Sequence, residues 1–107
     1  MQGIVHILFA NGDRSHTAHD LPPELDTFQS YVGGFLEEIP GFVLYQDKPC
    51  VAYANEDGDR LQLPVNSEAT VLWRKQGKFF PDIRGQFPLL RGDVVVVTGD
   101  EEFMEEL

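Results

Sequence analysis

Two runs of consecutive apolar residues, at positions 3–10 and 93–98, are the strongest pattern in the chain. Runs in which neighbouring residues are all apolar predict strands that are covered on both faces of a sheet. We therefore expect these two strands to lie side by side at the centre of one sheet. A turn at Asn11-Gly12-Asp13 follows the first run, and a short strand or a loop is expected at residues 16–21.

Two further segments have the 3.6-residue periodicity of helices that bury one side. The first covers residues 23–33 and ends at Gly33-Gly34, because glycine readily adopts the left-handed conformation in which many helices end. The second covers residues 66–75, and the side chain of Asn66 or Ser67 is suited to accept a hydrogen bond at its first turn. The acidic residues after position 100 are expected to form a short helix.

The middle of the chain has the turn signals of β structure. Residues 35–39 and 42–45 are expected to be strands on either side of a tight Pro-Gly turn. Residues 50–55 and 61–64 are expected to form a hairpin, because an Asp-Gly pair between apolar runs favours hairpin turns. Together these elements predict a single α+β domain over residues 1–107. Its sheet would be mixed or antiparallel, with five or six strands and two helices packed on it.

Length and composition agree with one packed domain. The chain has 107 residues, of which 42 % are hydrophobic, and this is enough for one core. A single cysteine, Cys50, excludes a disulfide within the chain and a multi-thiolate zinc site, and it favours a reducing compartment. The sequence has no secretory signal and no apolar run near the roughly 20 residues of a membrane span. We therefore expect a cytoplasmic protein without membrane association.

The charge balance is strongly acidic and unevenly distributed. Eighteen acidic and eight basic residues give a net charge of −10, which repels nucleic acid and favours a protein partner with a basic surface. Five of the basic residues lie in residues 74–91, where cations alternate with aromatic rings, as in proteins that bind single-stranded nucleic acids. The residues concerned are Arg74, Lys75, Lys78, Phe79, Phe80, Arg84, Phe87 and Arg91. The net charge favours the simpler interpretation that these cations neutralise neighbouring carboxylates.

Few residues have the spacing of a metal or catalytic site. His16 and His19 would need a third metal ligand, and nothing in the spacing supplies one. The segment that begins at Asn55 resembles the start of a calcium loop, but Arg60 stands where such a loop needs glycine. Known nucleotide-binding and hydrolase motifs are absent from the sequence, so we expect no metal, no cofactor and no catalytic residues. Asn55 and Asn66 could meet at one end of the sheet beside a small polar pocket, and they are the candidate small-ligand site.

Four blocks in a fixed order resemble a known family. They are YVGGFLE at 31–37, NEDG at 55–58, LPVN at 63–66 followed by Ala69, and GDVVVVTG at 92–99. Over roughly residues 25–103 the chain is similar to the phage- and actinobacteria-associated family of domains of unknown function numbered 3846. The resemblance implies a compact α+β domain, often encoded by phage, plasmid or actinobacterial genomes, and no assigned chemistry. Residues 76–91 look like an atypical insertion in that pattern.

These observations favour a non-catalytic binding or interaction module, as an accessory protein of phage or mobile-element origin that acts on a host protein. A sharper version is a mimic of DNA, whose carboxylates imitate the phosphates of a duplex. Two alternatives stay open. One is a single-stranded nucleic-acid contact through residues 74–91, and the other is a small-ligand binder or small enzyme at Asn55 and Asn66. Exposed strand edges are also compatible with a dimer formed by strand addition.

Overall fold

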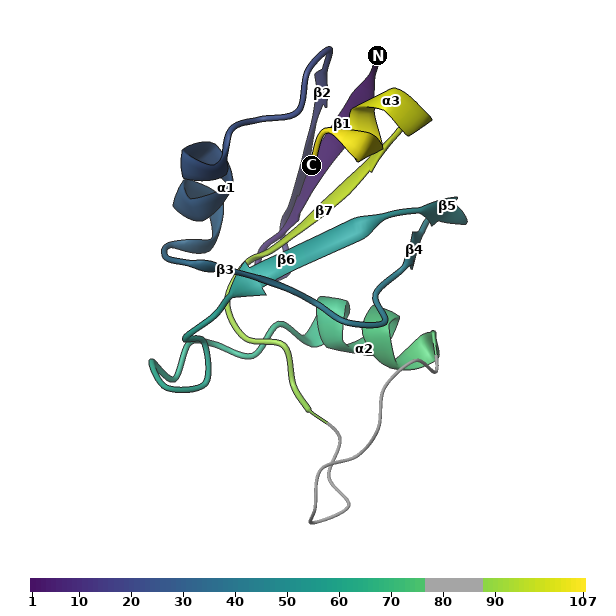
Figure 1. The fold of residues 1–107 in the computed structure, drawn as a ribbon. Helices are drawn as coiled ribbons and strands as arrows, with labels where there is room; N and C mark the ends of the chain where they lie inside the picture. Colours follow the sequence, from purple (N-terminus) through teal and green to yellow (C-terminus); the bar gives the residue numbers. More distant parts are fainter. Residues whose placement is uncertain (77–87) are drawn as a thin grey trace.

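The computed structural model describes residues 1–76 and 88–107, which form an α+β domain (Figure 1). Its main sheet is antiparallel and has five strands in the order β2-β1-β7-β6-β3. These strands are β1 (Gly3–Leu8), β2 (Arg14–His19), β3 (Leu36–Glu38), β6 (Val51–Asn55) and β7 (Val94–Gly99). A second, two-stranded sheet consists of β4 (Leu44–Tyr45) and β5 (Lys48–Pro49). The helices are α1 (Leu25–Val32), α2 (Ser67–Lys75) and α3 (Glu101–Glu105).

Strands β1 and β7 are neighbours at the centre of the main sheet, as the two apolar runs predicted. In the antiparallel register of this pair, Val5 lies opposite Val97 and Leu8 lies opposite Val94. The four consecutive valines of β7 have no exposed surface. A strand in which every residue is buried must be covered on both faces of its sheet, and this is why its sequence shows no alternation of polar and apolar residues.

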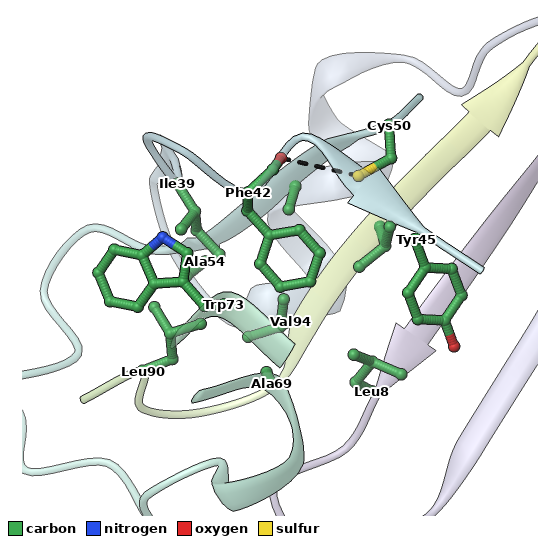
Figure 2. Close-up of a cluster of buried hydrophobic side chains, with 12 residues drawn as sticks. Leu8, Ile39, Phe42, Tyr45, Cys50, Ala54, Ala69, Trp73, Leu90 and Val94 are labelled. Carbon is green, nitrogen blue, oxygen red and sulfur yellow. Dashed lines mark hydrogen bonds between the residues drawn. The ribbon is translucent and has the colours of Figure 1, made fainter. Parts of the chain in front are cut away.

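Side chains that alternate along β7 divide the core into two clusters. The cluster on the α2 face includes Leu8, Phe42, Ala69, Trp73, Val94 and Val96 (Figure 2). The cluster on the opposite face includes Val5, Phe28, Val32, Val95, Val97 and Phe103, which brings α1 and α3 onto the sheet. Successive residues of β7 point to opposite sides of the sheet. One set of its valines packs with α2 and the other with α1, so the two helices predicted from the sequence cover opposite faces.

Three helix ends follow capping signals in the sequence, whereas α1 begins at Leu25, two residues later than predicted, and the side chain of Glu24 before it makes no capping hydrogen bond. Helix α1 ends at Gly33, which has a φ angle of 76° and whose N–H donates to the carbonyl of Gln29 over 2.9 Å. Helix α2 begins after Asn66, whose side-chain oxygen accepts a hydrogen bond of 3.1 Å from the N–H of Ala69. The short C-terminal helix begins after Asp100 in the same way. Local side-chain chemistry therefore sets these ends.

The predicted hairpin between residues 50–55 and 61–64 is wrong. Residues 56–62 form turns and residues 63–64 are irregular; the N–H of Leu61 donates to the carbonyl of Asp57 over 2.8 Å and the N–H of Leu63 to that of Gly58 over 3.0 Å. Strand β6 already pairs with β3 on one side and with β7 on the other. Because both of its edges are occupied, β6 offers no edge to a returning strand.

The Pro-Gly turn after residue 39 also does not join two paired strands. Strand β3 pairs with β6, with Leu36 opposite Asn55, and not with residues 42–45. Gly41 has a φ angle of 78°, and the chain after it turns into the core, where Phe42 is 2 % exposed. The burial of this large ring therefore decides the path of the chain at this point.

In the described part of the chain, no helix has the length and apolar character that a membrane crossing requires. The cytoplasmic location stays a prediction from the sequence.

Candidate functional site

The β4–β5 hairpin packs Tyr45 into the core and is also bound by the side chain of Gln76, the residue after α2. Gln46 and Asp47, at the tip of the hairpin, have φ angles of 52° and 64°, as a tight two-residue turn requires. The side-chain oxygen of Gln76 accepts hydrogen bonds from the N–H groups of Val43 at 2.8 Å and of Leu44 at 3.0 Å. Its amide nitrogen donates to the carbonyl of Leu44 over 3.1 Å. Gln76 thereby joins the first strand of the hairpin to the end of α2.

This hairpin places Tyr45 against His6, one of two paired histidines of the main sheet. His6 and His16 are cross-strand partners in β1 and β2, and their ring centroids are 6.3 Å apart. The ring centroid of Tyr45 lies 4.8 Å from that of His6. A cleft of about 320 Å³ opens between the hairpin and the sheet. We call it the histidine cleft, and its lining residues are Ile4, His6, Arg14, Ser15, His16, Tyr45 and Gln46.

The electrostatics of the histidine cleft disfavour a charged His6. Burial lowers the pKa of His6, and the nearby positive groups of His16, Lys48 and Arg14 lower that pKa further. The Nε2 atom of His6 lies 3.3 Å from the hydroxyl oxygen of Thr98, within hydrogen-bonding distance. His6 is therefore neutral at neutral pH, and the charged groups that act on it from nearby are basic.

Titration of His6 predicts a pH-dependent component of stability. Because folding lowers the pKa of His6, the unfolded chain binds a proton first as the pH falls. This component is fully present above about pH 6.5, the ordinary histidine value, and is lost as the pH falls toward the lower pKa of the folded state. We expect the His6→Gln variant to lose less stability than the wild type between about pH 7.5 and 5.5 in urea unfolding. Equal losses in the two proteins would contradict this.

A second hollow lies on the opposite face of the sheet, beside α1. It has a volume of about 710 Å³ and is lined by Leu21, Pro22, Pro23, Glu24, Leu25, Phe28, Leu36, Glu38, Tyr53, Glu106 and Leu107. We call it the acidic-rimmed groove, because each charged side chain in this lining is a glutamate. Leu21 and Leu25 are 68 % and 59 % exposed, which is high for large apolar side chains.

A further cavity of about 650 Å³ lies at the end of the sheet where β1 begins. Its lining includes Lys48 together with Asp20 and Asp100, so charges of both signs meet there. This mixture favours no single class of ligand.

None of the hollows that we describe is lined by both Asn55 and Asn66. Asn55 donates to the carbonyl of Val32 over 3.1 Å and accepts from the N–H of Asp57 over 2.8 Å. Asn66 donates to the carbonyls of Leu8 and Gly92 over 2.8 and 3.0 Å, in addition to capping α2. Asn55 lines a hollow of about 70 Å³, and Asn66 does not line it. A ligand site at these two residues stays a prediction, and their backbone contacts do not favour it.

The basic residues predicted to contact nucleic acid are only partly described. Arg74 and Lys75 are exposed in the last turn of α2. Arg91 pairs with the carboxylate of Asp59 at 3.3 Å and donates to the carbonyl of Leu63 over 3.0 Å, so it has a structural role. Lys78, Phe79, Phe80 and Arg84 lie outside the described residues. The nucleic-acid contact and the atypical character of residues 76–91 therefore stay predictions.

Neither a metal centre nor a reactive thiol emerges from residues 1–76 and 88–107. No group of three or more His, Cys, Asp or Glu residues in these ranges could hold a metal ion. Cys50 is buried, its thiol lies 3.6 Å from the carbonyl oxygen of Phe42 (Figure 2), and burial raises its pKa to about 11. A thiol with so high a pKa is a poor nucleophile at neutral pH.

The histidine cleft and the acidic-rimmed groove were not predicted from the sequence. His6 lies within an apolar run, and its position opposite His16 follows from the register of the β1–β2 pair. Aligning the segments on either side of the turn at Gly12 as antiparallel strands would have placed His6 opposite His16. The groove combines residues from four separate segments, and no local pattern marks them.

Comparison with known proteins identifies the family of this chain. Residues 5–106 match the family described as a domain of unknown function, DUF3846. This range is wider than residues 25–103, on which the four sequence blocks rested. No curated protein and no solved structure matches the chain. Since the match covers more than half of its length, the chain belongs to the DUF3846 family.

Proposed function

We propose that this protein is a non-catalytic interaction module, which binds a basic and apolar segment of a partner protein in the acidic-rimmed groove. The observation that supports this proposal is the composition of the groove, in which an apolar floor is surrounded by glutamates. A partner with a basic surface is also what the net charge favours. An origin in a phage or mobile element, with a host protein as the partner, rests on the sequence resemblance.

The floor of the groove supplies the affinity in this proposal. Phe28 is a buried core residue of α1, and its ring centroid lies 5.5 Å from that of Tyr53 in β6. Leu21 and Leu25 stand beside these rings and are largely exposed. Apolar side chains that gather at a hollow rimmed by polar residues are typical of protein interaction sites. Covering Leu21 and Leu25 with the apolar side chains of a partner removes their surface from water.

The rim supplies the selectivity. Glu24, Glu38 and Glu106 come from three separate segments, and no lysine or arginine among the described residues lines the groove. Lysine or arginine side chains at the edges of a bound segment would meet these carboxylates, and acidic side chains would be repelled. The net charge of −10 adds long-range attraction for a basic partner, which raises its association rate.

Fluorescence anisotropy with synthetic amphipathic peptides tests the proposal. The peptides share their length and apolar residues and carry lysine, serine or glutamate at the polar positions. We expect the lysine peptide to bind more tightly than the glutamate peptide by about tenfold or more, with affinity that falls as salt is added. Leu25→Ser should weaken binding without unfolding the protein, because this side chain is largely exposed.

A charge-matched pair of variants locates the binding surface. The double variant Glu38→Gln with Glu106→Gln should weaken binding of the lysine peptide several-fold. The control is Glu101→Gln with Glu105→Gln, which changes the net charge equally at exposed residues of α3 that do not line the groove. Equal losses in both double variants, or equal affinity for all three peptides, would overturn the proposal.

A further inference from the structure

We propose that the histidine cleft is a second binding site, which takes a small anionic molecule through a phosphate or carboxylate group. It lies on the α2 face of the sheet, whereas the acidic-rimmed groove lies on the α1 face. The ligands of the two sites would therefore bind on opposite faces of the sheet. The proposal rests on three observations: the donors that converge on the cleft, the sign of the charges around it and its volume.

Hydrogen-bond donors from three strands converge on the cleft. His6 and His16 face it from adjacent strands, and Tyr45 faces it from the hairpin above them. Figure 2 shows the hydroxyl group of Tyr45 pointing away from the apolar cluster that holds its ring. Within the described residues this hydroxyl makes no hydrogen bond, so it is available to a ligand. The side-chain amide of Gln46 adds a further donor at the rim.

The charges around the cleft favour an anion. Arg14 lines it from β2, where its guanidinium also pairs with Glu68 of α2, and Lys48 stands on the returning strand of the hairpin. Among the described residues, no aspartate or glutamate lines the cleft. The contact of His6 with β7 is to the uncharged hydroxyl of Thr98. A locally basic cleft on a chain of net charge −10 admits a small anion, while the rest of the surface repels a large polyanion.

The basic groups that favour an anion in the cleft also disfavour a proton on His6. Burial and three basic neighbours lower the pKa of His6 in the free protein. An anion in the cleft reverses the sign of the local field and favours the charged imidazole. Binding is therefore coupled to the uptake of a proton by His6.

The volume of the cleft limits the size of the ligand. At about 320 Å³ it lies at the lower end of the range of small-molecule sites, which begins near roughly 300 Å³. A single phosphate or carboxylate with a small organic group fits this volume, whereas a nucleic-acid strand does not.

Histidine resonances in NMR spectra test the proposal directly, because the chain has three histidines and one of them is an internal control. His19 lies in the same strand as His16, three positions along it, and does not line the cleft. The probes are inorganic phosphate and acetate, each titrated at constant ionic strength. We expect at least one probe to move the titration midpoints of His6 and His16 to higher pH by about half a unit or more in a saturable way. The titration curve of His19 should stay the same.

Two variants separate binding from folding. Tyr45→Phe keeps the buried ring and removes only the hydroxyl, so it should fold normally and weaken binding of the active probe several-fold. His16→Gln should weaken it further, and the matched control His19→Gln should bind as the wild type does. Titration curves that stay unchanged with both probes, or that change equally for all three histidines, would overturn the proposal. Equal losses in His16→Gln and His19→Gln would overturn it as well. Glu38→Gln tests the independence of the acidic-rimmed groove, because it should leave this binding unchanged.

Discussion

Asn66→Ala is expected to lower the free energy of unfolding by about 3 kcal/mol. The side chain of Asn66 is 1 % exposed and makes three hydrogen bonds, one as the cap of α2 and two to the carbonyls of Leu8 and Gly92. Loss of a helix cap costs about 1 kcal/mol, and a buried carbonyl without a donor costs about as much or more. Urea unfolding measures the change, which is a large share of the 5–15 kcal/mol typical of small domains.

Two further variants assign this loss to the buried amide of Asn66. Ser67→Ala changes the next residue, which is exposed, and should alter stability by less than about 0.5 kcal/mol. Asn66→Asp keeps the capping oxygen but places a carboxylate against two carbonyl oxygens, so it should be strongly destabilising at neutral pH. This variant should recover stability as the pH falls, because the protonated acid is a donor again. A loss below about 1 kcal/mol in Asn66→Ala would show that the amide donor contributes nothing beyond the helix cap.

Gly3→Ala is expected to cost about 2–3 kcal/mol, although it adds a single methyl group. A Cβ atom at Gly3 would lie 2.2 Å from a ring carbon of Phe103, and one at Gly99 would lie 2.7 Å from the same ring. Gly3 and Gly99 are cross-strand partners in β1 and β7, so together they form a flat surface on which the buried ring of Phe103 packs. Thermal and urea unfolding of the variant measure the cost.

A double-mutant cycle separates this clash from other effects of the substitution. Phe103→Ala alone should cost about 3–5 kcal/mol, because it removes a fully buried ring. Adding Gly3→Ala to Phe103→Ala should cost almost nothing and could even stabilise, since alanine restricts the unfolded chain more than glycine does. If Gly3→Ala is equally costly in both backgrounds, contact with Phe103 is not the cause.

Features that depend on local chemistry were predicted well from the sequence. Asn66 as the first cap of α2, Gly33 as the end of α1 and the buried pair β1 and β7 are all confirmed. Each depends on a residue and its close sequence neighbours, or on a run of consecutive apolar residues. The four sequence blocks that indicated the family are also short local patterns, and the match over residues 5–106 confirms that family.

Features that depend on competition between distant segments were not predicted. The Asp-Gly pair at Asp57 favours a hairpin locally, yet β3 and β7 occupy both edges of β6. The face that each helix covers depends on which valines of β7 it meets, and a sequence pattern cannot assign this. The histidine cleft depends on the register of β1 and β2 and on the hairpin that Gln76 anchors. In each case the deciding partner lies many residues away.

The central position of β7 also governs how the chain folds during its synthesis. His6 and Thr98 meet across the β1–β7 pair although they are 92 residues apart in the sequence. Until β7 has left the ribosome, β1 can pair only with β2, and an isolated two-stranded hairpin is marginally stable in water. Closing so long a loop gives the domain a high contact order and slow folding. The apolar side chains of β1 therefore lack their β7 neighbour until residues 94–99 have emerged, and the sheet closes only after that point.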